Sequence, residues 1–187
     1  AVYQVMNSSL ALKTIEVLKD VIPVSADAVK KGLLETRWQG RMETVLPGVI
    51  VDGAHNEDAA KKLKTSIERY FTGKELILIM GVFKDKEYEK IVQILCPPAK
   101  RIYTVDLPNK DRTLPAEKLA ECVRDCKKET DVSAEKSIED AVTKAYTYAL
   151  EDPGNRVVIA CGSLSYLSEV IRCVEGCVQN SQRKERK

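Results

Sequence analysis

Strand-like apolar segments alternate along this chain with segments whose apolar residues recur at helical spacing, and this alternation predicts an α/β fold. Four segments predict strands: Val49 to Asp52, Leu76 to Met80, Arg101 to Val105 and Val157 to Cys161. The segment Leu76 to Met80 is apolar at every position, which is typical of a strand covered on both faces. Apolar residues at helical spacing fill the segments between them, over residues 57–71, 86–95, 115–128 and 137–150. Strands alternating with helices predict a mostly parallel, Rossmann-like sheet with helices on both faces.

Shorter segments complete the predicted sheet. Met42 to Leu46 precedes the turn-forming pair Pro47-Gly48, so this segment and the strand from Val49 predict two strands around a tight turn. A segment around Val132 is a candidate edge strand. A last helix is expected to open at Gly162-Ser163. Pro115 suits the first position of its helix, because a proline there loses no helical hydrogen bond.

The first 37 residues have a different pattern. Residues 3–19 and Ala26 to Glu35 predict two helices, with Ser25 as the N-cap of the second. These helices have little of their own chain to pack against, and the helical pattern is already present at the first residues. The expected division is a helical remnant of a central domain with its linker at 1–37, a main domain at 38–178 and a disordered basic tail at 179–187.

Charge and composition exclude several functional classes. The 187 residues include 30 Lys and Arg and 28 Asp and Glu, a net charge of +2, so no strong field attracts nucleic acid or a membrane surface. No apolar stretch reaches the roughly 18 residues that a membrane span requires. The six cysteines accompany an adequate apolar core and no secretory signal, which favours a reducing, cytoplasmic setting.

A zinc site is not expected. Cys122 with Cys126, and Cys173 with Cys177, are four residues apart and would share a helix face. Zinc sites need further Cys or His ligands close by, and the single histidine lies elsewhere in the chain. We expect these thiols to pack between helices and predict no metal ligand in this chain.

The strongest candidate chemistry follows the second strand. Asp52-Gly53-Ala54-His55-Asn56 contains the only histidine, at a point where a helix follows a strand. Ligands of open α/β sheets bind at the carboxyl ends of the strands, and a helix N-terminus offers free N–H groups to an anion. Ser163 occupies the same kind of position after the last strand, so we expect Asp52, His55 and Ser163 to share one cleft. The alternative is that Asn56 and Ser163 only cap helices and that His55 is an exposed loop residue.

Phosphate-binding loops are missing. The sequence contains neither Gly-x-x-x-x-Gly-Lys-Ser/Thr nor Gly-x-Gly-x-x-Gly after a strand. Any nucleotide triphosphate therefore needs another domain to hold its phosphates. The Asp52 carboxylate could still accept hydrogen bonds from the hydroxyls of a ribose, and the Arg41 guanidinium could neutralise phosphate charge.

Five motifs stand in order along the chain. They are Tyr3-Gln4-Val5-Met6-Asn7, Trp38-Gln39-Gly40-Arg41-Met42-Glu43, Asp52-Gly53-Ala54-His55-Asn56, Gly81-Val82-Phe83-Lys84-Asp85-Lys86 and Gly162-Ser163-Leu164. In this order they resemble the motifs of folylpolyglutamate synthase and the bifunctional dihydrofolate synthase, members of the Mur ligase superfamily. The resemblance spans nearly the whole chain.

The resemblance implies an ATP-dependent ligase, in which ATP phosphorylates a carboxylate of folate or dihydropteroate and the amine of L-glutamate attacks the acyl phosphate. It implies that this chain is the Rossmann-like C-terminal domain of a monomer and closes over the enzyme's own N-terminal ATPase domain. The phosphate loop and the Mg²⁺ ligands would lie in the missing domains, so the chain alone is expected to be inactive.

The resemblance also implies residue roles. Asn7 would contact adenine, Arg41 the phosphates and Asp52 the ribose. His55 and Ser163 would lie on the glutamate side of the cleft, with His55 as the candidate general base.

Two other interpretations stay open. One is a Mur-type ligase that joins an amino acid to another acceptor, and the other is a non-catalytic α/β module that binds a nucleotide or a protein. The motifs at Trp38 and Asp52 favour the folate branch. No role is defined for Lys84, Asp85, Lys86 or Arg112, and the folate form and glutamate chain length are not fixed by these residues.

Overall fold

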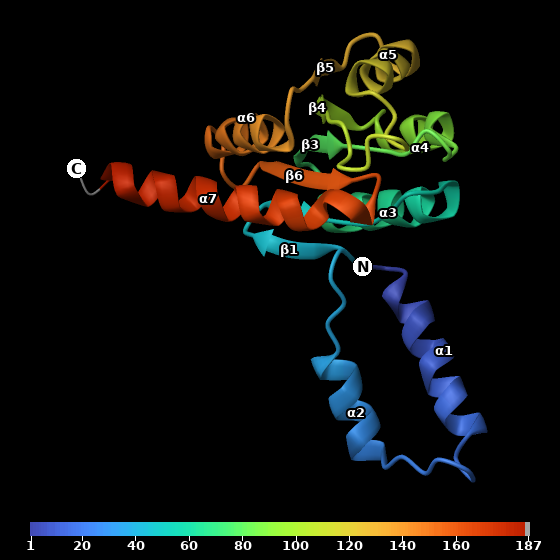
Figure 1. Ribbon diagram of the computed structural model, residues 1–187. Coiled ribbons are helices and arrows are strands. Elements are labelled where there is room, and N and C mark those ends of the chain that lie inside the picture. Colours follow the sequence, from blue (N-terminus) through green and yellow to red (C-terminus); the bar gives the residue numbers. More distant parts are fainter. Residues whose placement is uncertain (186–187) are drawn as a thin grey trace. The chain divides into compact units, whose positions relative to one another are not determined.

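The computed structural model describes the backbone of residues 1–185 and the side-chain environments of residues 1–179. The chain divides into two compact units, residues 1–39 and the residues from Gly40 onward, which are described separately (Figure 1).

The first unit consists of two helices, α1 (Gln4–Val17) and α2 (Ala26–Glu35). The Ser25 hydroxyl accepts a hydrogen bond from the Ala28 N–H at 3.2 Å, which confirms the predicted N-cap of α2. Neither helix contains a buried residue. Large apolar side chains such as Val5, Met6 and Leu10 are therefore exposed, and this unit has no core of its own.

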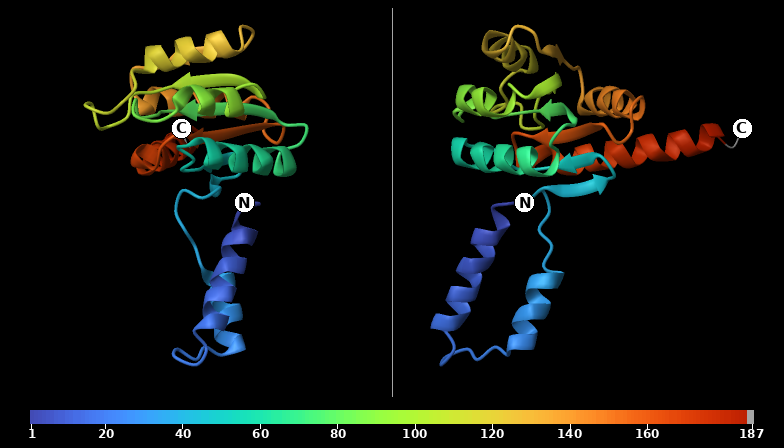
Figure 2. Two further views of the ribbon diagram at one scale, coloured as in Figure 1. Left: turned by 90° about the vertical axis from the view of Figure 1, so that its right-hand side faces the viewer. Right: turned by 180° about the vertical axis from the view of Figure 1, so that it is seen from behind.

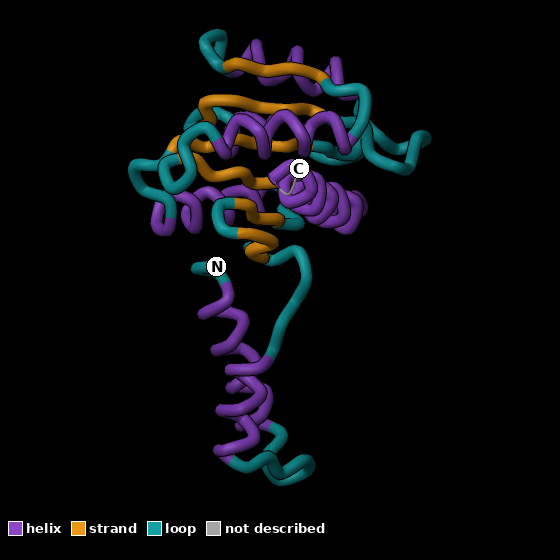
Figure 3. The backbone as a smooth tube through the Cα atoms, turned by 90° about the vertical axis from the view of Figure 1, so that its left-hand side faces the viewer, coloured by secondary structure: helices purple, strands orange, loops and turns teal. Residues whose placement is uncertain are grey.

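The second unit is built on one six-stranded sheet (Figure 3). The strands lie in the order β1-β2-β6-β3-β4-β5. Strand β1 pairs with β2 in antiparallel orientation and every other pair is parallel, which confirms the mostly parallel sheet. The strands are β1 (Glu43–Leu46), β2 (Val49–Val51), β3 (Glu75–Met80), β4 (Ala99–Thr104), β5 (Asp131–Ala134) and β6 (Arg156–Cys161).

Helices cover both faces of this sheet (Figure 2). The helices on one face are α3 (Glu57–Tyr70), α4 (Tyr88–Leu95) and α5 (Ala116–Cys126), and those on the other are α6 (Ile138–Leu150) and α7 (Leu167–Glu185). A single 3₁₀ turn, η1 (Leu164–Tyr166), precedes α7.

The continuous apolar run of β3 explains how one strand serves two cores. Leu76, Leu78 and Met80 belong to the core under α3, α4 and α5. Ile77 and Ile79 point to the opposite face and pack with α6 and α7. Because neighbouring strand residues face opposite sides, a strand buried on both sides must be apolar at every position. Burial of each such side chain contributes about 1.5–3 kcal/mol.

Several helix ends differ from the sequence-based expectation by a few residues, and those of α5 and α7 bear on earlier predictions. Pro115 lies one position before the first helical residue of α5, as its N-cap, because its ψ of 136° is not helical. The Asp106 carboxylate accepts the Ala116 N–H at 2.8 Å, in place of a side-chain cap from Pro115. Helix α7 extends to Glu185, so the backbone is helical through most of the segment expected to be a tail. The disordered basic tail was predicted for residues 179–187. Of these, residues 186–187 lie outside the described part of the chain.

Candidate functional site

The carboxyl ends of β2, β6 and β3 are neighbours, because β6 lies between the other two strands. The Asp52 N–H donates to the Ala160 carbonyl at 2.9 Å, and the Gly162 N–H donates to the Ala54 carbonyl at 2.9 Å. The loops that follow β2 and β6 are therefore hydrogen-bonded to each other. Asp52, His55 and Ser163 therefore lie on one edge of the sheet, and the cleft that we expected them to share stays a prediction.

Leu164 joins three of the sequence motifs. A Cβ built on Gly53 would lie 2.2 Å from Leu164 Cδ2, and one built on Gly40 would lie 2.9 Å from the same atom. Leu164 thus packs directly on both glycines, where any side chain would displace it. The φ of Gly53 is not positive, so this position requires a glycine for space and not for a left-handed backbone. Leu164 was missed as a contact because sequence spacing does not reveal packing between distant loops.

The segment that carries Arg41 has an unusual backbone. Gly40 has a φ of 67° and Met42 a φ of 51°, so left-handed residues stand on both sides of Arg41. A left-handed conformation is costly for a residue with a side chain, and it persists where surrounding contacts fix it. Arg41 itself is half-buried and forms no ion pair with the residues that the structure describes.

Asp52 supplies part of those surrounding contacts. Its Oδ2 accepts a hydrogen bond from the Met42 N–H at 2.8 Å, and its Oδ1 accepts one from the Ala54 N–H at 2.9 Å. The residue is 1% exposed. Both carboxylate oxygens therefore hold the main chain of the two loops, and the expected ribose contact of Asp52 stays a prediction.

His55 lies at the rim of the same loop and is half-buried. Its Nδ1 is 2.8 Å from the Gly53 carbonyl oxygen. A carbonyl only accepts hydrogen bonds, so we assign the proton of the neutral ring to Nδ1, which leaves Nε2 as an acceptor. An imidazole in this tautomer can accept a proton at Nε2.

Asn56 and Ser163 both cap helices, as the plainer interpretation expected. The Asn56 Oδ1 accepts from the Ala59 N–H at 2.8 Å, at the start of α3. The Ser163 Oγ accepts from the Ser165 N–H at 3.2 Å and lies 2.9 Å from Ser165 Oγ. Ser163 is 2% exposed. Capping is thus established for both residues, and the glutamate contact expected of Ser163 stays a prediction.

Asn7 belongs to the first unit. Its side-chain amide donates to Gln4 Oε1 at 2.6 Å, within one turn of α1, and the pair is exposed. This unit is described by itself, so the adenine contact predicted for Asn7 stays a prediction.

An ion pair ties the next two loops of this edge together. Arg112 donates from Nη2 to Asp85 Oδ2 at 2.8 Å and from Nε to Asp85 Oδ1 at 3.2 Å. Its guanidinium also lies 4.4 Å from the centre of the Phe83 ring. The hydrogen bonds from Arg112 lower the pKa of the Asp85 carboxyl below its usual range. The sequence left these residues without a role, and the structure shows that they fasten the loop after β3 to the loop after β4.

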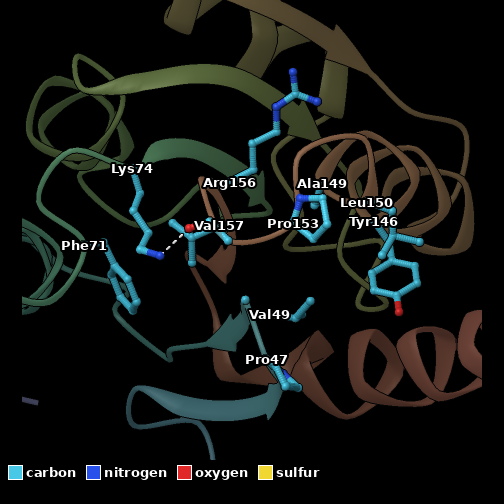
Figure 4. A pocket seen from close by; sticks show the side chains of 12 residues that line it. Pro47, Val49, Phe71, Lys74, Tyr146, Ala149, Leu150, Pro153, Arg156 and Val157 are labelled. Atoms are coloured by element: carbon cyan, nitrogen blue, oxygen red, sulfur yellow. Dashed lines mark hydrogen bonds between the residues drawn. The ribbon is translucent and has the colours of Figure 1, made fainter.

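A cavity lies at the opposite edge of the sheet (Figure 4). It has a volume of about 310 Å³ and lies near the amino ends of β2 and β6. Apolar side chains such as Phe71 and Leu150 line it, and the Lys74 ammonium donates to the Gly154 carbonyl beside it. None of the residues predicted from the motifs lines this cavity. The candidate chemistry and this hollow therefore belong to different parts of the domain.

The described residues contain neither a cluster of metal ligands nor a membrane-spanning helix. In the described part of the chain, no group of three or more His, Cys, Asp and Glu could hold a metal ion, so these residues do not fit a metal site. No helix in that part has the length and apolar character of a membrane span. The six cysteines, all within the described residues, form no disulfide.

Comparisons with known proteins agree with the motif pattern. The family model described as "Mur ligase, glutamate ligase domain" matches residues 40–164. The folylpolyglutamate synthase of Lacticaseibacillus casei is 27% identical over 176 residues, which are 91% of this chain and 38% of that protein.

Two solved structures have a similar fold. FolC of E. coli in complex with DHPP and ADP matches with a TM-score of 0.74 and 23% identity, over 95% of this chain and 39% of that one. The bifunctional folylpolyglutamate synthase/dihydrofolate synthase of Yersinia pestis, complexed with AMPPNP and Mn ion, matches with a TM-score of 0.69 and 25% identity, over 83% of this chain and 36% of that one. The chain thus spans less than two fifths of the length of these relatives.

Proposed function

Because this chain belongs to the Mur ligase family through its glutamate ligase domain, we propose that it provides the glutamate side of an ATP-dependent ligase that extends folate. The observation that carries this proposal is the match over residues 40–164, which includes Gly40, Gly53 and Leu164, where three motifs pack together. The L. casei relative supports folate as the acceptor, and the Y. pestis relative supports dihydropteroate as a second acceptor.

The proposed reaction has two steps. A carboxylate oxygen of the acceptor attacks the γ-phosphorus of ATP, which forms an acyl phosphate and releases ADP. The amine nitrogen of L-glutamate then attacks the acyl carbon, an amide bond forms, and the phosphate leaves with the electron pair of the broken C–O bond. The ammonium of glutamate must lose a proton before this attack, and the tetrahedral intermediate must lose another.

His55 is suited to one of these proton transfers. With Nδ1 donating to the Gly53 carbonyl, Nε2 of the neutral ring can accept a proton from the attacking amine. We assign this general-base role to His55 and the binding of a glutamate carboxylate to Ser163, which stands at the start of η1 on the same edge. We assign to Arg41 the contact with the phosphates of ATP and to Asn7 the contact with adenine.

The remaining parts of the site are assigned to other domains. The chain lacks a phosphate loop, and its described residues do not fit a metal site, so the ATP-bound divalent ion would be held elsewhere. Residues 1–37 are assigned to a preceding ATPase domain, which is supported by the absence of buried residues in α1 and α2. On this basis the chain alone has no ligase activity. A monomeric state and a cytoplasmic location are part of the same proposal.

A segment exchange tests this function. The 187 residues would replace the matching 38% of the L. casei enzyme, and ADP release would be measured with folate, ATP and L-glutamate. We expect release that depends on both folate and glutamate, and we expect none from the chain alone. A folded hybrid, checked by its melting curve, that shows no glutamate-dependent release would contradict the proposal. Turnover by the chain alone would contradict the division of the site.

A further inference from the structure

We propose that Asp52 is a positioning residue that holds Arg41 in place, and that it does so through the main chain of the segment from Gly40 to Met42. This inference rests on the proposed function only in that Arg41 is assigned there to phosphate. It gives Asp52 a task different from the ribose contact that the motif suggests.

Two hydrogen bonds from neighbouring residues hold the segment on either side of Arg41. The Gly53 N–H donates to the Gly40 carbonyl at 2.7 Å, and the Met42 N–H donates to Asp52 Oδ2 at 2.8 Å. Arg41 is the single residue between these two points. The backbone direction of Arg41 is therefore held by the pair Asp52-Gly53, which follows directly from β2, together with Glu43, whose Oε2 accepts the Gly40 N–H at 2.7 Å.

The left-handed backbone of Met42 explains why a charged acceptor is needed. A φ of 51° is unfavourable for a residue with a side chain, and no glycine occupies the position. A hydrogen bond to an ionised carboxylate is about twice as strong as one between neutral groups. The Asp52 carboxylate thus offsets the cost of the conformation that orients Arg41.

The surroundings of Asp52 leave its carboxylate committed to this task. The side chain is 1% exposed, its second oxygen accepts the Ala54 N–H, and its own N–H is held by the Ala160 carbonyl. A ribose hydroxyl could reach the carboxylate only if the loops separated. Arg41, in contrast, is half-buried and keeps part of its surface in contact with solvent.

A direct measurement on the unaltered chain tests the central contact. In uniformly ¹⁵N,¹³C-labelled chain, a scalar coupling across the hydrogen bond should connect the Met42 amide nitrogen with Asp52 Cγ. Hydrogen exchange of the Met42 amide should be slow in the unaltered chain and roughly tenfold faster in Asp52→Asn, because an asparagine keeps one acceptor oxygen for two N–H donors. Asp106→Asn is the matched control, since Asp106 holds the Ala116 N–H on the same edge without contacting Arg41.

Binding measurements distinguish positioning from a ribose contact. Affinities for ADP and for inorganic pyrophosphate, which has no ribose, would be compared in hybrid ligases that carry Asp52→Asn, Arg41→Ala or both substitutions. We expect Asp52→Asn to lower the affinity for both ligands by the same factor. In the Arg41→Ala background, Asp52→Asn should cause no further loss of affinity. A loss confined to ADP, or losses that multiply in the double variant, would overturn the positioning role.

The outcomes separate this inference from the proposed function. An absent coupling together with unchanged Met42 exchange in Asp52→Asn overturns the inference, whatever the hybrid ligase does. An inactive hybrid with the coupling and the exchange effect present leaves the positioning of Arg41 supported and rejects the ligase assignment.

Discussion

Leu164 occupies the space that a side chain at Gly53 would need, with only 2.2 Å between Leu164 Cδ2 and a Cβ built on Gly53. This contact holds the loop after β2 against the start of η1. Gly53→Ala should therefore lower the free energy of unfolding by up to about 1 kcal/mol, because the Leu164 side chain is 45% exposed and can move toward solvent to make room for the new carbon. Urea denaturation followed by circular dichroism measures this change.

The Gly53–Leu164 contact also predicts coupling between two substitutions. Leu164→Ala should recover part of the stability that Gly53→Ala loses, because the shorter side chain leaves room for the new Cβ. Gly176→Ala serves as the control, since no atom lies within 4 Å of a Cβ at Gly176, and it should be neutral or stabilising by up to about 1 kcal/mol. Fully additive losses at 53 and 164 would show that the two positions do not compete for space.

The Asp85–Arg112 pair should make stability depend on pH in the acid range. Hydrogen bonds from Arg112 lower the pKa of Asp85 in the folded chain, so the unfolded chain binds the proton more readily. The pair therefore stabilises the fold above about pH 4, and this contribution is lost as the pH falls through the lowered pKa. We expect Arg112→Ala to be less stable than the unaltered chain at pH 6 and the difference to shrink below pH 4.

A control separates this pair from the general effect of charge. Lys118→Ala removes the same positive charge from an exposed position of α5 that forms no ion pair with described residues. The effect of Arg112→Ala should be small, because both partners of its ion pair are about half exposed. A stability difference for Arg112→Ala that stays constant from pH 6 to pH 3 would exclude the pair as its source.

His55 should matter for turnover in the hybrid ligase. His55→Ala should lower kcat by about 10²–10⁴-fold, the range typical of a lost general base. Added imidazole should restore part of the rate, because it can accept the proton that Nε2 no longer accepts. Lys61→Ala, an exposed change on α3, is the control. Unchanged kcat together with an unchanged KM for glutamate would remove His55 from the mechanism.

The cysteines should differ in reactivity according to their burial. Cys126 is exposed, whereas Cys96 and Cys161 are buried, and burial raises the pKa of both buried thiols. At pH 8 an alkylating reagent should modify Cys126 first and leave Cys96 and Cys161 intact until urea unfolds the chain. Mass spectrometry of the digested protein identifies the modified positions. Modification of Cys161 at the rate of Cys126 in the native chain would contradict the described core.

The sequence predicted the sheet because its strongest signal is also the physical basis of the fold. The run Leu76 to Met80 has apolar side chains at every position, and the structure buries both of its faces. Asp52 and Ser163 each follow the carboxyl end of a strand, and parallel strands place these ends along one edge of the sheet. Their shared edge was therefore predictable from the sequence.

Contacts between distant loops could not be predicted in the same way. The packing of Leu164 on Gly53, the bond from Met42 to Asp52 and the Asp85–Arg112 pair depend on side-chain geometry that has no period along the chain. For the same reason Asp52, chosen as a ligand residue by its motif, is found buried against the main chain.

The place of β6 has a consequence for how the domain is made. This strand is the last of the six in the chain, yet it lies between β2 and β3 in the middle of the sheet. During synthesis, the earlier strands leave two unsatisfied edges facing one another until residue 161 has emerged from the ribosome. Such open edges favour association with other chains, and their closure over a long sequence separation is slow. Truncation before Arg156 should therefore yield aggregates and no smaller stable domain.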